Sequence, residues 1–84
     1  METHELVARI ESKADLVTFI EALVRDLREK PTGWENPTLE GYLSALARWL
    51  EDSDGVYQNQ GRPIPANPSW RNVGEMLIAA TIYE

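Results

Sequence analysis

The chain has 84 residues and is therefore expected to form one domain, spanning residues 1–84. It has no cysteine, which excludes disulfides and thiolate catalysis, and its single histidine cannot by itself build a structural zinc site. Its net charge of −6, from eight bases and fourteen acids, repels phosphate backbones and anionic lipids. We therefore expect no nucleic acid, membrane surface, metal or cofactor as a partner.

The start of the chain is acidic, whereas a secretion signal would be basic. No apolar run approaches the ~20 residues that a membrane span needs. The sequence thus predicts a cytoplasmic protein. A short first helix is expected over residues 4–10, where Leu6, Val7 and Ile10 would be stable only when packed on the rest of the fold.

A second helix is predicted over residues 13–29. Ser12 is placed to cap it, and Asp15 occupies the position of a capping-box acid. The opposite face of this helix is charged and is expected in solvent, and Pro31 ends the helix. Apolar residues recur at spacings of three and four and form one helical stripe: Leu16, Phe19, Ile20, Leu23 and Leu27.

Two further helix starts are marked by an asparagine followed by a proline, at Asn36 and Asn67. Asparagine is a favoured N-cap, a residue before proline is pushed out of the α region, and proline suits the first helical position. With these asparagines as N-caps, we expect helices over residues 38–51 and 69–83. The polar residues 52–67 between them are predicted to form a long loop, which is either functional or mobile.

These segments together predict an all-α fold, a small bundle of four helices packed around leucine and tryptophan stripes. Trp49 and Trp70 fall on such stripes and are expected in the core. The third helix carries Leu39, Tyr42, Leu43, Leu46, Trp49 and Leu50 on one side, and the fourth carries Trp70, Val73, Leu77 and Ala80.

The segment 76–83 is apolar at seven of eight positions, so the last helix has no polar face over its final turns. Either this is the central helix of the bundle, or part of it is exposed and forms an interface with a partner. In the second case Met76 and Ile82 are candidate partner-binding residues, and two copies of the chain could form a homodimer through them.

The turn that contains Trp34 and Glu35 also has two interpretations. Trp34 can fold over the next helix and close the bundle, as a hydrophobic staple does. Alternatively it is the anchor of a recognition loop, with Glu35 as the charge beside it. Arg71 opposes the dipole at a helix start, which predicts an acidic partner, and Glu35 is our candidate. Tyr57, in the predicted loop, completes the candidate partner-binding residues.

Residues 51–55 place three acids before a glycine and suggest a calcium loop. When that glycine is aligned with the EF-hand glycine, however, the first ligand position falls on Leu50 and the twelfth on Gly61. Helix termination in a polar turn explains the segment better. No spacing selects a nucleophile or a pair of catalytic carboxylates, so we expect the protein not to be an enzyme.

The order of these features resembles a family of short bacterial proteins, domain of unknown function 7660. The resemblance covers about residues 6–84 and implies a bacterial, stand-alone helical domain, with no activity or site attached. Its most specific parts are the Trp-Glu-Asn triplet and the Ala-x-x-Tyr-Glu ending. The residues that carry it are an Asp-Leu pair before an apolar helix, Trp34-Glu35-Asn36, Thr38-Leu39, Tyr42-Leu43, Trp49, Trp70, Ala80 and Tyr83-Glu84.

Function is predicted from the type of molecule. Small, acidic, catalytically inert domains suit protein binding, and negative charge suits a basic partner protein. Toxin-neutralising immunity proteins are one concrete version of this hypothesis. The alternative is a structural homo-oligomer that pairs through the apolar C-terminal helix.

Overall fold

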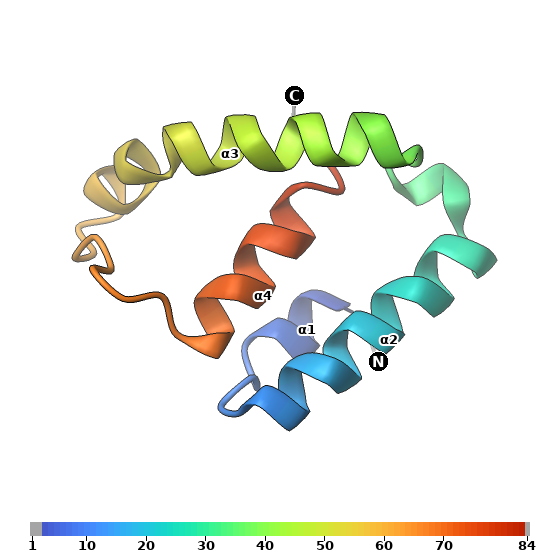
Figure 1. Cartoon of the computed structure of the whole chain (residues 1–84), viewed down its shortest axis with the longest axis horizontal. Helices are drawn as coiled ribbons and strands as arrows, with labels where there is room; N and C mark the ends of the chain where they lie inside the picture. Colours follow the sequence, from blue (N-terminus) through green and yellow to red (C-terminus); the bar gives the residue numbers. More distant parts are fainter. Residues whose placement is uncertain (1–2, 84) are drawn as a thin grey trace.

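The computed structural model describes residues 3–83, which form helices and no strand. The prediction of an all-α fold with four helices is confirmed (Figure 1). In chain order the elements are α1 (Thr3–Val7), α2 (Lys13–Glu29), the short 3₁₀ helix η1 (Pro31–Gly33), α3 (Leu39–Asn59) and α4 (Trp70–Ala79).

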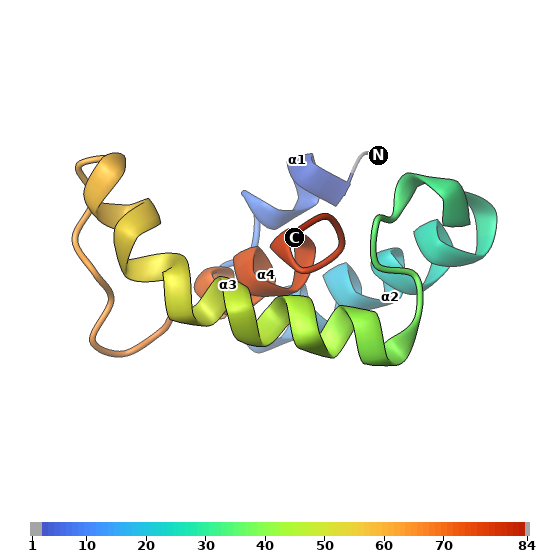
Figure 2. The same ribbon diagram turned by 90° about the horizontal axis from the view of Figure 1, so that it is seen from above.

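Helix α4 is the central helix of the fold. It packs against α1, α2 and α3, and Figures 1 and 2 show it between α2 and α3. Its residues Gly74 and Ile78 are buried, as are Ala80 and Thr81 in the turn that follows. The interpretation of the apolar C-terminal segment as the centre of the bundle is confirmed. Within residues 3–83, α2 and α3 each contact α4 but do not contact one another.

The hydrophobic core lies where α1, α2 and α4 meet. Phe19 and Ile10 are its most deeply buried large side chains, at 1% and 2% exposure. A methyl group at Gly74 would collide with the Ile10 side chain and lie 3.2 Å from Val7 Cγ2, so the α1 segment approaches α4 closely because residue 74 is a glycine. The remaining core residues are Leu16, Leu23 and Ile78.

Helix α2 begins as predicted, whereas the predicted N-caps of α3 and α4 are wrong. The Ser12 hydroxyl caps α2 as predicted. The caps of α3 and α4, however, are Thr38 and Ser69, not Asn36 and Asn67; each hydroxyl accepts a hydrogen bond of 3.1 Å from the backbone N–H three residues later. Threonine and serine are themselves good N-caps with extended backbone, so each helix begins just after the Asn-Pro pair.

The ends of α3 and α4 also differ from the predictions. Helix α3 continues to Asn59, because Ser53 and Tyr57 are buried on its inner face and extend its packing past the polar segment. The predicted 52–67 loop is therefore confined to residues 60–69. Helix α4 ends at Ala79 instead of residue 83, where the chain tightens into a turn.

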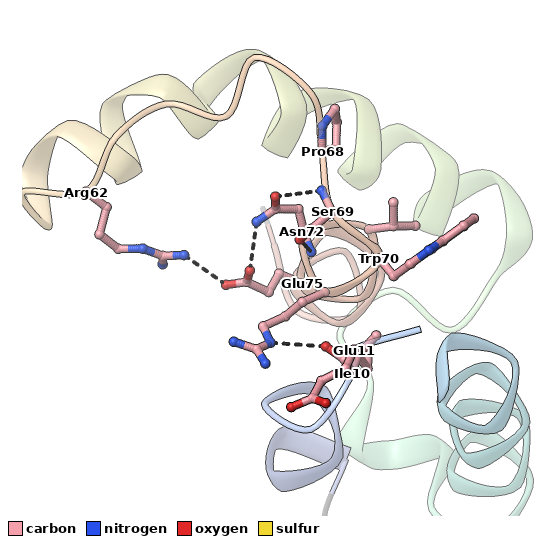
Figure 3. Close-up of a pocket in the computed structure, with 10 residues that line it drawn as sticks. Ile10, Glu11, Arg62, Pro68, Ser69, Trp70, Asn72 and Glu75 are labelled. Atoms are coloured by element: carbon pink, nitrogen blue, oxygen red, sulfur yellow. Dashed lines mark hydrogen bonds and ion pairs between the residues drawn. The ribbon is translucent and has the colours of Figure 1, made fainter. Parts of the chain in front are cut away.

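Trp70 was expected in the core but is 46% exposed. It occupies the first position of α4, where side chains point back beyond the end of the helix and no preceding turn covers them. Figure 3 shows its ring extending away from Arg62 and Glu75. Trp49, on the inner side of α3, is half-buried.

Candidate functional site

A hollow of about 360 Å³ lies between α2 and the first turns of α3. We call it the α2–α3 groove. Because α2 and α3 do not pack against one another in the described part of the chain, the space between them is closed from behind by α4 and at one end by the turn that joins the two helices. The groove is lined mainly by hydrocarbon: Ile20, Val24 and Leu27 from α2, Leu39 and Tyr42 from α3, and Leu77 from α4.

Several aliphatic side chains on the walls of this groove are open to solvent. Leu39 is 75% exposed, and Ile20 and Val24 are 41% and 44% exposed. Val17, one turn before Ile20, and Leu43, one turn after Leu39, are also exposed and continue these rows beyond the lining of the hollow. We call these five residues the groove patch. A cluster of exposed aliphatic side chains around a hollow is typical of an interaction surface.

Trp34 closes one end of the groove and is held from two sides. Its indole N–H donates to Asp26 Oδ2 at 2.9 Å, and its ring centroid lies 5.8 Å from that of Tyr42. Trp34 is half-buried and packs against the core cluster. These contacts match its interpretation as the residue that closes the bundle, while part of its ring remains on the groove wall.

Asn36 joins the α2–α3 turn to the end of α4. Its backbone N–H donates to Thr81 O at 3.1 Å, and its side-chain Nδ2 donates to Ala80 O at 3.1 Å and to Tyr83 O at 2.8 Å. Carbonyls at a helix C-terminus lack N–H partners within the helix, and the Asn36 side chain donates hydrogen bonds to such carbonyls here. Asn36 is therefore a clamp on the end of α4, and not the N-cap of α3.

Two tyrosines fasten α3 to the C-terminal part of the chain. The Tyr42 hydroxyl donates to Leu77 O at 2.6 Å, and burial raises the pKa of Tyr42. The Tyr83 hydroxyl donates to Asp52, and this hydrogen bond is the main reason that the pKa of Tyr83 is raised. With the Asn36 clamp, these bonds fix the spacing between the groove walls.

The predicted pair between Glu35 and Arg71 is wrong. Glu35 is exposed beside the Asn36 clamp at the C-terminal end of α4, whereas Arg71 lies at the N-terminal end of that helix. Ten residues of helix, about 15 Å, separate the two ends. Arg71 Nε instead donates to the carbonyl of Ile10 at 3.2 Å.

The other predicted partner-binding residues do not gather at one place. Tyr57 is buried on α3, not in a loop, and the Arg62 guanidinium lies 4.9 Å from its ring centroid. Met76 is half-buried on α4 and borders a small separate hollow of about 160 Å³. Ile82 is 52% exposed in the turn after α4. Of the predicted partner-binding residues, only Trp34 lines the groove, and Glu35 follows it in the chain. The residues of the groove walls were missed.

The missed residues are Ile20, Val24 and Leu39. Ile20 and Leu39 had been assigned to core stripes, since periodicity alone does not show whether an apolar face meets another helix. One signal was present in the sequence. Val17 and Val24 are apolar residues outside the α2 stripe, so α2 carries more apolar surface than one packed face requires.

A larger hollow of about 700 Å³ lies beside the first turn of α4 (Figure 3). Arg62 lies 3.6 Å from Glu75, which also accepts a hydrogen bond from Asn72 at 3.2 Å. The lining holds two bases, Arg62 and Arg71, and two acids, Glu11 and Glu75. Because these charges balance and Arg62 is paired with Glu75, the hollow selects no charge on a ligand.

No three acidic or histidine side chains within residues 3–83 are grouped so that they could hold a metal ion. Among the helices described for this chain, none combines the length and the apolar character that crossing a bilayer requires.

A family model of unknown function, domain of unknown function 7660, matches residues 12–84. The chain belongs to this family. The match confirms the resemblance drawn from the Trp-Glu-Asn triplet and the C-terminal ending. Comparisons with curated proteins and with solved structures find no match.

The region that matches the family model begins at the N-cap of α2. It contains α2, α3 and α4 and therefore every residue that lines the α2–α3 groove, whereas α1 precedes it. The Trp-Glu-Asn triplet of the family resemblance is the turn that closes the groove and clamps α4.

Proposed function

We propose that this protein is a non-catalytic binding module that holds a partner protein in the α2–α3 groove. The observation that carries the proposal is the groove patch, five exposed aliphatic side chains on two helices that do not pack against one another. Three of the five, Ile20, Val24 and Leu39, line the hollow between these helices. Leaving such side chains in water is unfavourable by roughly 25 cal/mol per Å² of apolar surface, and a partner that covers them gains that free energy.

The partner is expected to be basic. The chain carries a net charge of −6, and three exposed acids, Glu21, Glu35 and Glu40, adjoin groove-lining residues in the chain. Two exposed bases, Arg25 and Arg28, also adjoin the lining on α2, so the exposed acids exceed the bases by one. Opposite charge on a partner speeds its association and favours it over acidic competitors. A basic toxin that the protein neutralises is one concrete version of such a partner.

Self-association is the competing proposal. The apolar residues of α4 are largely packed inside the chain, so the surface that remains for pairing lies on α2 and α3. A second copy would bring another charge of −6 to that surface, and like charges oppose association. These observations favour a basic partner over a homodimer.

Photo-crosslinking from the groove tests the proposal. A photoreactive amino acid is placed at Leu39, which is 75% exposed, and in a matched control at Ile64, an exposed aliphatic residue in the 60–69 segment. We expect position 39 to crosslink one basic protein in host lysate and position 64 not to do so. The purified partner should then bind the Val24→Asp variant at least tenfold more weakly than the parent.

Three results would contradict the proposal. One is equal crosslinking from positions 39 and 64, and another is crosslinking from position 39 to copies of the same chain alone. The third is a partner whose affinity falls in an Ile82→Asp variant and not in Val24→Asp, which would assign binding to the surface beyond α4.

A further inference from the structure

We infer that the groove receives a single amphipathic helix of the partner, about three turns long, with a basic outer face. This inference rests on the proposed function and adds the form of the bound segment. It follows from the polar groups of the groove, from the spacing of its apolar residues and from the charge beside it.

The polar groups around the groove are already bonded within the chain. The Trp34 indole N–H is bound to Asp26, the Tyr42 hydroxyl to Leu77 O, and the Asn36 amide to the carbonyls at the end of α4. An extended segment would therefore place its own backbone N–H and C=O groups against hydrocarbon without partners, which is strongly unfavourable. A helix satisfies these groups internally and presents only side chains, so it suits this surface.

The walls of the groove have the geometry of helix packing. Val17, Ile20 and Val24 follow one another at spacings of three and four on α2, and Leu39 and Leu43 are four apart on α3. Such rows are the ridges between which the side chains of another helix insert. A third helix would thus complete a layer that α2 and α3 leave open.

The extent of the apolar wall sets the length of the bound helix. From Val17 to Leu27 helix α2 rises about 15 Å, which equals ten residues or roughly three turns of a partner helix. Such a helix would contact the groove through apolar residues at positions i, i+3 or i+4, and i+7. Lysine or arginine on its outer face would lie near Glu21 and Glu40.

A synthetic peptide tests the inference. The probe is a 14-residue helix with leucines at i, i+3, i+4 and i+7 and lysines elsewhere, compared with an order-scrambled isomer and with a leucine–glutamate counterpart. Backbone amide shifts measured by NMR should concentrate on α2 and the start of α3 when the leucine–lysine helix is added. We expect the scrambled isomer and the glutamate peptide to bind at least tenfold more weakly.

Leu39→Asp supplies the matching protein variant. An acid at the first position of α3 suits the helix dipole, so this variant should fold normally. Loss of one leucine contact should weaken peptide binding by about tenfold to a hundredfold. Ile64→Asp, which changes an exposed aliphatic residue outside the groove, should leave the affinity unchanged.

The outcomes separate this inference from the proposed function. Equal binding of the scrambled isomer, or amide shifts centred on the start of α4, would overturn the inference that the groove receives a helix. If position 39 crosslinks a basic protein whose bound segment is extended, the helix inference fails and the binding module stands. If no protein crosslinks while the peptide binds at the groove, the groove accepts helices but the proposed function fails.

Discussion

Two sides of helix α2 show how one helix can serve both stability and binding. Phe19 points into the corner between α1, α2 and α4 and is 1% exposed, whereas Val24, little more than one turn later, borders the groove and is 44% exposed. Both residues are apolar and both lie on the same helix. The difference is made by what lies opposite, because α1 and α4 cover one side and no element in the described part of the chain covers the other.

Helix α4 shows the same contrast. On one side Gly74 lets the Ile10 segment approach closely, and the side chains there are almost completely buried. On the other side Leu77 is half-buried behind the open groove. The largest buried side chains are therefore concentrated in the α1–α2–α4 corner, whereas α3 is joined to α4 by packing and by hydrogen bonds from Asn36 and Tyr42.

The largest effect is expected in the core corner. Phe19→Ala should lower the free energy of unfolding by about 3–5 kcal/mol, because it removes a fully buried ring. A chain of this size has a free energy of unfolding of roughly 4–12 kcal/mol, so the variant should lose a large share of its stability. Leu39→Ala, on the groove wall, should change stability by less than about 0.5 kcal/mol. Urea unfolding followed by circular dichroism measures both, and similar losses in the two variants would contradict the comparison.

The next effect concerns the clamp that joins the two regions. Asn36→Asp should destabilise the fold by at least about 1–3 kcal/mol, because a carboxylate cannot donate to the carbonyls of Ala80 and Tyr83. If Asn36 were an N-cap, aspartate would replace it without loss. Thr38→Asp is the matched control, since Thr38 is the true N-cap and should tolerate aspartate. Thermal unfolding of the two variants decides between clamp and cap.

Local features of the fold could be predicted from the sequence because they depend on neighbouring residues. The Ser12 cap, the length of α2 and the number of helices all follow from residues within one or two turns of each other. The central place of α4 was also predictable, since a helix without a polar face must be covered on several sides.

Features that depend on distant residues could not be predicted. Asn36 reaches a carbonyl 44 residues away, so its Asn-Pro pattern looks like an N-cap until the fold is known. Helix α3 continues through a polar segment that predicted a loop, because Ser53 and Tyr57 are buried by the rest of the fold. The groove was missed for the same reason: a stripe of leucines shows an apolar face but does not show whether another helix covers it.

Two glycines provide a smaller test of the packed and open regions. Gly74→Ala should destabilise the fold by up to about 2 kcal/mol, since collision with the buried Ile10 outweighs the gain of roughly 1 kcal/mol in helix propensity. Gly55→Ala, in α3 with open space around it, should stabilise the fold by about 0.5–1 kcal/mol. Changes of opposite sign in the free energy of unfolding, measured with urea, would support close packing at Gly74. Stabilisation by both variants would argue against it.

The smallest effect concerns Tyr42 on the groove side and depends on pH. At pH 7, Tyr42→Phe loses the hydrogen bond to Leu77 O and should cost about 0.5–1.5 kcal/mol. Burial raises the pKa of Tyr42 above its ordinary value of 10.0, so the folded chain holds the phenolic proton more tightly than the unfolded chain. The stability that this provides is complete below pH 10 and is lost as the pH rises through the raised pKa of the folded state.

The parent should therefore lose its advantage over Tyr42→Phe above pH 10, and unfolding by urea at pH 7, 9 and 10.5 measures this change. Tyr83, whose pKa is raised mainly by its hydrogen bond to Asp52, titrates in the same direction, so both proteins are compared in a Tyr83→Phe background. A difference between parent and variant that stays constant across the three pH values would show that Tyr42 is not buried against α4. The groove would then lack the fixed wall that a bound helix requires.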